Sequence, residues 1–511
     1  MREVSIDPVP LERMEPLLTP ERADRLRTMA KHARGLLHGR TVWNLSSTSQ
    51  GGGVAEMLQA LLAYGRGGGV DTRWLVMEGD PEFFELTKRL HNMLHDAPGD
   101  AGALGPGERE HYLAVTRANA EVARRLVRPG DIVLAHDPQT AGMVSSLQEV
   151  GAAVAWRCHI GSGLVSERTD TAWGFLREFI EPADAYIFSR PQYAPSWLSP
   201  DRVWIIAPSI DPFSTKNVQL RHADVVAALD RAGLVDLRPE DGSLMFTRRE
   251  GSSGYVRAHR GLIDGGEPIP GAARVVMQLS RWDRLKDMTG VLAGFATHVH
   301  TLPDDVHLLL AGPDVSGVAD DPEGAAELAS CRALWQQLPT PVRERVHLCC
   351  LPMDDVDENA HLVNCLQRHA SVVVQKSLAE GFGLTVTEPM WKAKPVVASA
   401  VGGIEDQIED GISGLLLRDA TDTEGMVAGV ARLLADPALA ASLGTAARER
   451  VRERFLGDRH LIQYVQLFDT LLEPGHDVRP SLDVTRGPVQ RRPQGRESPG
   501  QPGEGAPWEP T

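Results

Sequence analysis

Residues 371–392, SVVVQKSLAEGFGLTVTEPMWK, contain the pattern that decides the fold. The β-branched run at 371–375 predicts a strand buried on both faces, as in a parallel sheet. A turn with Gly381 and Gly383 follows, and then a stretch that begins like an amphipathic helix. Open α/β sheets bind ligands beyond the carboxyl ends of their strands, at turns of this kind. The stretch therefore predicts a parallel α/β sheet with a ligand site at its edge.

Two carboxylates, Glu380 and Glu388, flank this turn with seven residues between them. The glycines let backbone N–H groups approach an anion closely, and the N-terminus of the following helix carries partial positive charge. The alternative is an ordinary strand–helix turn with two solvated glutamates. Features elsewhere in the chain are needed to distinguish a ligand-binding turn from an ordinary one.

Strand and helix patterns alternate through both halves of the chain. Strands are expected at 41–47, 71–78, 131–137, 152–160 and 184–190, and then at 273–280, 306–312, 345–351, 371–375, 395–399 and 414–417. Helical spacing between them predicts right-handed βαβ units. The expected fold class is α/β, with two doubly wound, Rossmann-like domains that face each other across a cleft. Such clefts are favoured ligand sites.

The alternation breaks at residues 211–270, where Gly, Arg and Asp are frequent. A chain of 511 residues is also too long for one core. We expect an N-terminal domain at 1–220, a linker or insertion at 221–270, a C-terminal domain at 271–455, a C-terminal helix packing back toward the N-terminal domain at 456–474, and a disordered Pro/Gly-rich tail at 475–511.

The net charge of −16, with no basic cluster in the folded part, argues against nucleic acid and anionic membranes as partners. Five cysteines without CxxC spacing fit reduced thiols. The N-terminus has no signal-peptide core, and no apolar run approaches the roughly 20 residues of a membrane span. We therefore expect a cytoplasmic protein.

A second Gly-rich turn, TSQGGGVAE at 48–56, lies between a strand and a helix. Gly52 and Gly53 would allow close backbone approach to a phosphate or a sugar. The turn matches neither GxGxxG nor a P-loop, so neither a dinucleotide dehydrogenase nor an NTPase is indicated. A flexible structural turn is the alternative.

Charged residues follow the first strand of the second half, in SRWDRLKD at 280–287. Arg281 and Lys286 suit two adjacent phosphates, because one offers a fork of donors and the other a point charge. Solvated charges at a helix start are the alternative.

Polar residues end two strands of the first half: His136 and Asp137 after one, and His159 after another. Both strand ends should face the cleft, which makes these residues candidates for ligand contact, although a lone histidine is more often structural. Neither a GxSxG elbow nor an HExxH metal site is present.

Together these features resemble the retaining glycosyltransferases of the GT-B fold, over residues 40–220 and 270–472. More narrowly, the chain resembles the trehalose glycosyltransferring synthases, in STSQGGGVAEML, RWLVMEGDPEFFELTKRLHN, WRCHI, PSIDPFSTKN, SRWDRLKD, QKSLAEGFGLTVTEPMWK and VGGIEDQIEDGISGLL. The resemblance implies transfer of glucose from a nucleoside-diphosphate glucose to free glucose, which gives α,α-trehalose with retention.

The resemblance also implies roles for single residues. Four form the implied catalytic set: Glu380 at the donor glucose, Arg281 and Lys286 at the diphosphate, and His159 by the donor sugar. The implied donor-binding set is Gly52, Gly53, Gly381, Phe382, Gly383, Leu384, Thr385 and Glu388, the last on the ribose hydroxyls. His136 and Asp137 should lie near the acceptor.

In this family a same-face displacement is the usual proposal, with the departing phosphate oxygen taking the acceptor's proton. No metal or other cofactor is then required, and Mg²⁺ would act only as a stimulant through the nucleotide. The expected partners are a nucleoside-diphosphate glucose and glucose, with a homodimer common in the family. The base of the donor and the oligomeric state stay open.

The sequence departs from the family in three places: Gly161 stands where such enzymes often carry an acid, residues 235–270 are inserted at the hinge, and the tail has no counterpart. Two other functions stay open. One is a retaining GT-B glycosyltransferase with a different acceptor, and the other is a non-catalytic sugar-nucleotide sensor.

Overall fold

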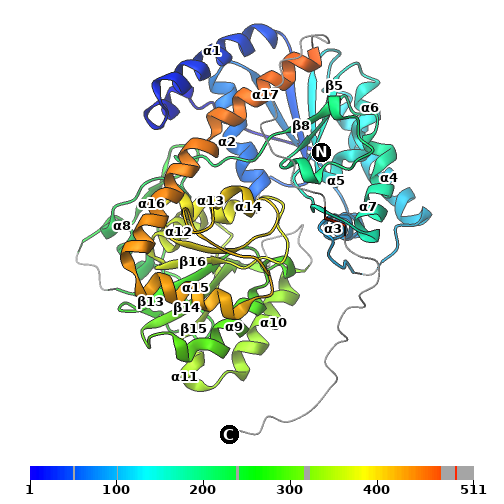
Figure 1. Cartoon of the computed structure of the whole chain (residues 1–511). Helices are drawn as coiled ribbons and strands as arrows, with labels where there is room; N and C mark the ends of the chain where they lie inside the picture. The colour runs from blue at the N-terminus through cyan, green and yellow to red at the C-terminus, as the bar shows by residue number, and fades with distance from the viewer. Residues whose placement is uncertain (50–51, 101, 238–240, 316–322, 473–489, 492–511) are drawn as a thin grey trace.

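The computed structural model describes residues 1–49, 52–100, 102–237, 241–315, 323–472 and 490–491. Two α/β halves each enclose a central sheet, and the long helix α17 (Gly457–Leu472) runs from the second half back to the first (Figure 1). Parallel sheets with interleaved helices confirm the expected α/β class.

The first sheet has seven strands in the order β1-β3-β2-β4-β5-β7-β8. They are β1 (Arg2–Val4), β2 (Thr41–Ser46), β3 (Asp71–Val76), β4 (Ile132–His136), β5 (Ala153–Cys158), β7 (Ala185–Phe188) and β8 (Val203–Ile205). Only the edge pair β1–β3 is antiparallel. The five predicted strands are present. The other two, β1 and β8, have three residues each, which is too short for a strand periodicity to be recognised in the sequence.

Helices cover both faces of this sheet. They are α1 (Pro20–Leu36), α2 (Gly53–Gly67), α3 (Pro81–Leu94), α4 (Pro106–Ala123) and α7 (Glu167–Ile180). The residues after β4 form no single helix but are broken into α5 (Asp137–Thr140), a 3₁₀ turn and α6 (Val144–Gln148). At the break, the Gly142 N–H donates to the Tyr112 hydroxyl at 3.0 Å, so a side chain takes the place of a helical carbonyl.

The second sheet is wholly parallel, with six strands in the order β15-β14-β13-β16-β17-β18. Its strands are β13 (Arg274–Leu279), β14 (Val306–Pro313), β15 (Val346–Leu351), β16 (Val372–Gln375), β17 (Val396–Ser399) and β18 (Leu415–Leu417), all of them predicted. Its helices are α9 (Met288–His298), α10 (Gly324–Gln337), α11 (Thr340–Arg343), α12 (Val356–His369), α13 (Leu384–Trp391), α14 (Ile404–Gln407), α15 (Thr423–Ala435) and α16 (Pro437–Arg454).

Residues 211–270 pack against the second sheet. They contain α8 (His222–Arg231), the parallel pair β9 (Val235–Asp236) and β12 (Ile269–Pro270), and the antiparallel pair β10 (Met245–Thr247) and β11 (Ser253–Tyr255). Leu229 and Phe246 belong to the same hydrophobic cluster as Met277 of β13. The insertion therefore shares a core with the second half.

Helix α17 buries Tyr464, Leu467 and Phe468 in one cluster with Ala33 of α1 and Met57 of α2. The last strand, β19 (Gln490–Arg491), pairs in parallel with β6 (Leu164–Val165). The rest of the expected tail at 475–511 lies outside the described residues, and the bounds of the domains stay a prediction.

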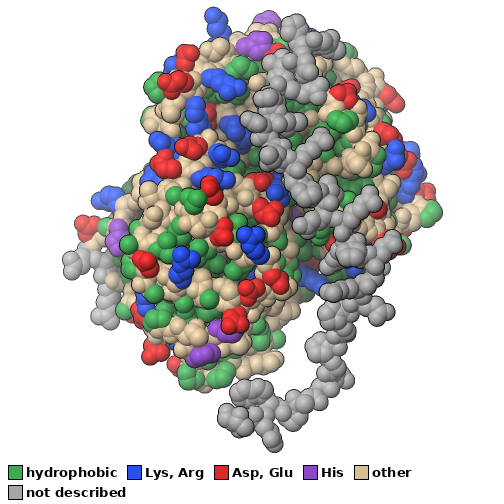
Figure 2. Space-filling model, in the orientation of Figure 1, with side chains coloured by type: hydrophobic (Ala, Val, Ile, Leu, Met, Phe, Trp, Pro, Cys, Tyr) green, Lys and Arg blue, Asp and Glu red, His purple; other side chains and the backbone are tan. Residues whose placement is uncertain are grey.

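Acidic and basic side chains are interspersed over the face in Figure 2, and no continuous basic stripe crosses it. All five cysteines are free thiols, four of them buried. Among the described helices, none is long and apolar enough alone to cross a membrane; α15 and α16 pass that test only as a pair bent by 105°.

Candidate active site

A cavity of about 1150 Å³ lies between the two sheets, at the carboxyl ends of their strands. Every residue that the sequence assigns to the site lines it: Gly52, Gly53, His136, Asp137, His159, Arg281, Lys286, Glu380, Gly381, Phe382, Gly383, Leu384, Thr385 and Glu388. Residues more than 300 positions apart therefore meet in one cleft. Whether each has the expected role stays a prediction.

The turn after β16 is shaped by glycines that no other residue could replace without strain. Gly383 precedes α13 with φ +91°, and Gly402 has φ +52°. A Cβ on Gly402 would lie 1.7 Å from the Glu380 carbonyl oxygen, and one on Gly381 would lie 2.4 Å from that of His159. These close approaches fix the backbone that carries Glu380.

The first half of the chain also holds this turn. The Tyr193 hydroxyl lies 3.1 Å from the Glu380 carbonyl and 2.7 Å from the Gly381 carbonyl, to which it donates. The ring of Tyr193 also explains Gly161, because a Cβ there would lie 2.4 Å from its Cγ. The acid often found at that position would not fit beside this ring.

Lys286 and Glu380 form an ion pair at the centre of the cleft, and both side chains are mostly buried. Asp283 lies beside them, 3.7 Å from Arg281 Nη2 and 3.1 Å from the ammonium of Lys88. Lys88 belongs to α3, so a third cation reaches the cleft from the first half. A cluster of three cations around one buried carboxylate suits a diphosphate.

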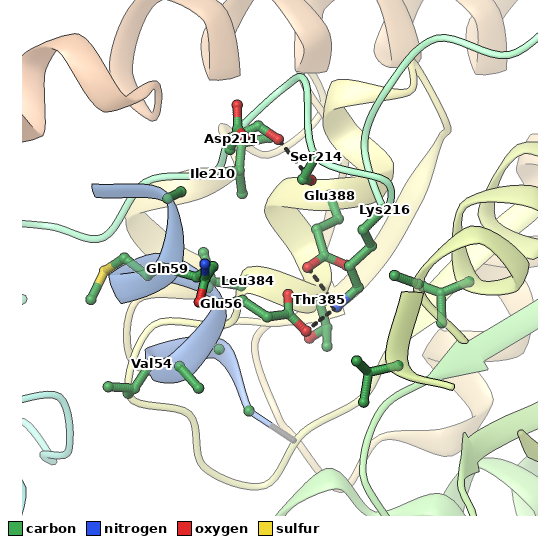
Figure 3. A pocket seen from close by; sticks show the side chains of 18 of the residues that line it. Val54, Glu56, Gln59, Ile210, Asp211, Ser214, Lys216, Leu384, Thr385 and Glu388 are labelled. Carbon is green, nitrogen blue, oxygen red and sulfur yellow. Dashed lines mark hydrogen bonds and ion pairs between the residues drawn. The ribbon is translucent and has the colours of Figure 1, made fainter. Parts of the chain in front are cut away.

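Glu388 is the second buried carboxylate, and both of its oxygens have partners. Lys216 Nζ lies 3.0 Å from its Oε1, and the Gln367 amide donates to its Oε2 at 3.0 Å. Lys216 also lies 3.0 Å from Glu56 of α2, so its ammonium bridges the two halves (Figure 3). Among the described residues, the buried Thr385 hydroxyl in the same wall has no hydrogen-bond partner.

Gly52 caps α2, which Gly53 begins, and the preceding residues 50 and 51 lie outside the described part of the chain. A Cβ on Gly53 would lie 2.9 Å from Leu384 Cδ1. The starts of α2 and α13 therefore lie against each other where both line the cleft. Two helix N-termini at one cavity favour an anionic ligand there.

His136, Asp137 and His159 form the opposite wall. The two ring planes differ by 10° and their centroids lie 5.3 Å apart, with His136 Nδ1 3.0 Å from His159 Nε2. Asp137 accepts the His159 backbone N–H at 2.7 Å and has φ +64°. Burial lowers the pKa of His136 to about 3 and raises the pKa of Asp137 to about 7. Burial also lowers the pKa of His159 well below its ordinary value, so both imidazoles are neutral near pH 7.

Sequence reasoning does not find Lys88, Lys216, Tyr193 or His95. Burial lowers the pKa of His95 to about 4 in the wall beside Glu380. Lys88 and His95 lie on one helix, where their spacing is that of any amphipathic surface. PSIDPFSTKN contains Lys216 and is quoted above, but nothing local separates that lysine from a solvated one. In the described part of the chain, no group of three or more His, Cys, Asp or Glu could hold a metal.

Comparison with known proteins now places this cleft in a family. Residues 44–195 match the model "Trehalose synthase, N-terminal domain", and residues 263–450 match "Glycosyl transferases group 1". A trehalose synthase of Pyrococcus horikoshii is 34% identical over 472 residues, which cover 92% of this chain and 99% of that protein. The chain belongs to the trehalose synthase family. A trehalose synthase of Rubrobacter xylanophilus is 32% identical over 441 residues, covering 86% and 92%.

Solved structures similar to this trehalose synthase homologue establish the architecture. An α,α-trehalose-phosphate synthase (UDP-forming) from Burkholderia vietnamiensis has a TM-score of 0.61 at 15% identity, and covers 84% of this chain and 96% of that one. A sucrose-phosphate synthase from Thermosynechococcus elongatus has a TM-score of 0.58 at 20% identity, covering 84% and 99%. The expected GT-B fold is confirmed, and the protein is a glycosyltransferase of the trehalose-related kind.

Proposed function

We propose that the protein is a retaining glucosyltransferase that moves glucose from a nucleoside-diphosphate glucose to free glucose and forms α,α-trehalose. One observation carries the proposal: Arg281, Lys286, Glu380 and Glu388 open into a single cleft opposite the hydrogen-bonded pair of His136 and His159. Cations for a leaving group, carboxylates for hydroxyls and a wall of neutral imidazoles are thereby gathered around one volume.

The diphosphate would lie against Arg281 and Lys286. In the ligand-free cleft Lys286 is paired with Glu380, and Arg281 lies 3.7 Å from Asp283. As the glycosidic bond breaks, negative charge grows on the diphosphate, and fixed cations in a water-poor site stabilise that charge. Glu388 would hold the ribose, and the unpartnered Thr385 hydroxyl would find an acceptor in the donor.

The transfer step balances with the groups of the two substrates. The bond from C1 of glucose to the phosphate oxygen breaks, and the acceptor hydroxyl oxygen bonds to C1 on the same face. The departing phosphate oxygen takes the acceptor's proton. Glu380 then binds donor hydroxyls while Lys286 moves toward the diphosphate. Closure of the two halves would limit hydrolysis by excluding water.

Similar proteins support this choice of substrates. A trehalose-6-phosphate synthase structure from E. coli, with a TM-score of 0.62 at 13% identity, was solved bound with UDP-2-fluoro glucose. Glucose itself is proposed as the acceptor because the chain belongs to the trehalose synthases rather than to the phosphate-forming enzymes. Within this proposal we also expect a homodimer in the cytoplasm, with no nucleic-acid or membrane partner.

The test is an assay of the purified protein with UDP-, ADP- and GDP-glucose, each with glucose or glucose 6-phosphate. We expect trehalose and a nucleoside diphosphate in equal amounts, with the α,α-linkage read by NMR. Arg281→Ala and Glu380→Gln should lower kcat/KM about 100-fold or more. Arg284→Ala is the matched control, because Arg284 is exposed on the same 3₁₀ turn and does not line the cleft.

Other outcomes would replace the proposal. Nucleoside diphosphate release without trehalose would mean a different acceptor. Conversion of maltose to trehalose without any nucleotide sugar would mean an isomerase. Donor binding without turnover under every acceptor would mean a sugar-nucleotide sensor.

A further inference from the structure

Arg157, the charged residue of β5, is fully buried and lies two residues before the cleft residue His159. Its Nη1 donates to the Tyr464 hydroxyl and lies 3.3 Å from His460 Nε2, and its Nη2 donates to the Ile206 carbonyl at 3.1 Å. Its Nε donates to His159 Nδ1 at 3.4 Å. None of the described carboxylates forms an ion pair with it. A buried charge without a counterion is costly and rarely kept for stability alone.

The guanidinium determines which nitrogen of each cleft histidine carries the proton. Arginine only donates, so His159 Nδ1 must accept and the His159 proton must lie on Nε2. That N–H can then donate only to His136 Nδ1, at 3.0 Å. The His136 proton is therefore on Nε2 and is donated to Asn44 Oδ1, at 3.1 Å.

The opposite direction of this chain is excluded by Arg157. If the Asn44 amide were turned round, His136 Nε2 would accept and Nδ1–H would donate to His159 Nε2. His159 would then need to accept at both nitrogens, which a neutral imidazole cannot do. The Asn44 Nδ2 group is buried without a hydrogen-bond partner among the described residues, so the direction fixed by Arg157 leaves this amide N–H group unpaired.

The same guanidinium connects this wall to the C-terminal helix. Since His460 Nε2 faces Arg157, it accepts, and His460 Nδ1–H donates to the Ser209 hydroxyl at 2.8 Å. Tyr464 lies one turn further along α17, with its ring stacked on that of His460. The orientation of Arg157 therefore depends on two residues of α17.

We infer that Arg157 is a positioning residue, which fixes His159 and His136 in one tautomeric arrangement and makes that arrangement depend on helix α17. The inference rests on the proposed function only where it assigns His159 to the donor sugar. The tautomers themselves are a property of the ligand-free protein and can be tested without turnover.

The charged and polar groups around His136 and His159 agree with this role of Arg157. Burial, and after it the guanidinium, lower the pKa of His159 well below its ordinary value. The groups that face the pair are Arg157 from β5, His460 and Tyr464 from α17, and Asp137 from α5. Because only one of them is cationic, removing the guanidinium should raise the pKa of His159.

The first experiment is NMR on the full chain with ring-¹⁵N-labelled histidine. The chain has 17 histidines, and the His159 signals are assigned by their loss in His159→Gln. At pH 7 we expect a neutral ring with the proton on Nε2. A protonated ring, or a proton on Nδ1, would overturn the inference whatever the protein catalyses.

The second experiment perturbs the guanidinium. Arg157→Met should lower kcat/KM about tenfold or more and shift the acid limb of its pH profile to higher pH, because a misplaced imidazole costs catalysis steeply. Arg157→Lys keeps the charge and should shift that limb less. Equal acid limbs in all three proteins would contradict the inference.

A milder variant covers the case in which Arg157→Met does not fold. Tyr464→Phe removes only the hydroxyl that accepts from Arg157, and should weaken the preference for the Nε2–H tautomer of His159. The matched control is Tyr186→Phe, a buried tyrosine of β7 whose hydroxyl donates to the Glu181 carbonyl at 2.8 Å. If the two variants gave the same His159 spectrum, α17 would have no part in positioning the ring.

Discussion

At the scale of single residues, the cleft depends on backbone positions that admit no side chain. Gly402 and Gly411 both have positive φ, +52° and +74°, but only Gly402 presses on another residue. A Cβ on Gly402 would meet the Glu380 carbonyl, whereas one on Gly411 would meet nothing within 4 Å. The pair therefore separates the cost of the backbone angle from the cost of the contact.

We predict that Gly411→Ala lowers the free energy of unfolding by about 1–2 kcal/mol, the cost of a left-handed alanine. Gly402→Ala should cost more and should also reduce kcat/KM, because the turn that carries Glu380 has to move. Urea unfolding and steady-state kinetics of the two variants check this. Equal losses of activity would mean that the contact does not position Glu380.

Asp137 gives a prediction about pH. Burial raises its pKa in the folded protein to about 7, from an ordinary value of 3.8. Between these pH values the folded state keeps a proton that the unfolded state has released, so stability falls as pH rises from about 4 to about 7. The loss is on the order of 4 kcal/mol at most.

Asp137→Asn should remove this slope, since an amide does not titrate and Asn tolerates the left-handed φ. Urea unfolding at pH 5 and pH 8 should show a larger difference for the wild-type chain than for this variant. Asp304→Asn, at a fully exposed carboxylate, is the control and should leave the difference unchanged. A wild-type slope that survives in Asp137→Asn would refute the assignment.

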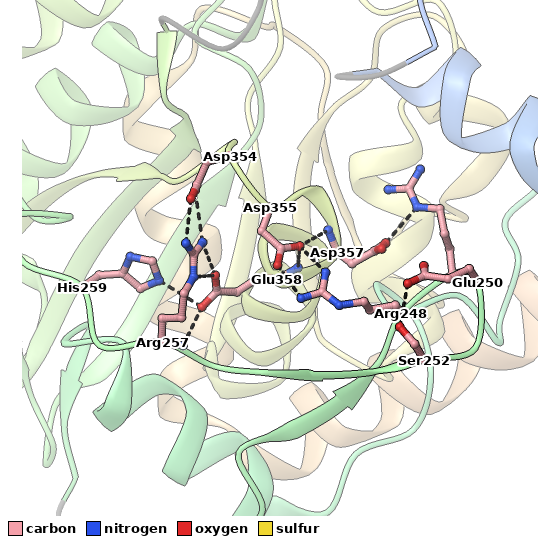
Figure 4. A network of polar contacts seen from close by, with 10 residues as sticks. Arg248, Glu250, Ser252, Arg257, His259, Asp354, Asp355, Asp357 and Glu358 are labelled. Carbon is pink, nitrogen blue, oxygen red and sulfur yellow. Dashed lines mark hydrogen bonds and ion pairs between the residues drawn. The ribbon is translucent and has the colours of Figure 1, made fainter.

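At the scale of elements, arginines in the inserted hairpin β10–β11 and just after it hold this segment on the start of α12. Their partners are the acids Asp354, Asp355, Asp357 and Glu358. Asp355 pairs with Arg248, and Glu358, which is fully buried, accepts from Arg257 and His259 (Figure 4). Asp354 binds the same Arg257 but is 63% exposed. One arginine thus offers a buried and an exposed partner for comparison.

Glu358→Gln should lower the free energy of unfolding by about 2 kcal/mol, because the buried carboxylate loses its charge-assisted hydrogen bonds to the half-exposed Arg257 and to His259. Asp354→Asn should cost less than about 1 kcal/mol, as exposed pairs do. Thermal unfolding measures the loss of stability in each variant. Limited proteolysis should cut residues 245–260 faster in Glu358→Gln but not in Asp354→Asn. Similar proteolysis in both would show that the hairpin is held elsewhere.

The sequence predicted the elements well where periodicity is long. All six strands of the second sheet and five strands of the first follow from alternation and apolar runs. The break at Gly142 was not predictable, because it depends on the Tyr112 hydroxyl, 30 residues away. Residues in motifs, such as Glu380 and Arg281, were predicted to lie in the cleft and do line it. Lys216 and Tyr193 were not predicted to lie there, since their contacts exist only after the halves meet.

At the scale of the whole molecule, Arg190 joins the two halves. Its Nη1 donates to the Gly402 carbonyl at 2.6 Å and lies 3.1 Å from Glu405, and its Nη2 donates to Asp406 at 3.1 Å. Arg202 is a matched arginine of the same half, which donates to the carbonyls of Glu181 and Ala183 and lies over the Tyr186 ring, 5.1 Å from its centroid. Only the first arginine crosses the cleft.

Arg190→Ala should therefore speed hydrogen exchange in residues 400–407 and lower kcat/KM, because the turn at Glu380 loses a support from the other half. Arg202→Ala should leave exchange at 400–407 unchanged. Mass-spectrometric exchange of both variants, with kinetics in parallel, provides the measurement. Unchanged exchange in Arg190→Ala would mean that other contacts hold the halves together.

The ion pair between Lys216 and Glu388 affects how a measured affinity for the donor nucleotide should be interpreted. Its ammonium already occupies the Glu388 oxygen that, on the proposed function, a ribose hydroxyl would take. The chain thus carries a tethered competitor for its own donor, present at the high effective concentration that a tether provides. Measured nucleotide affinity is then the difference between two contacts, and a weak dissociation constant would be compatible with a strong ribose contact.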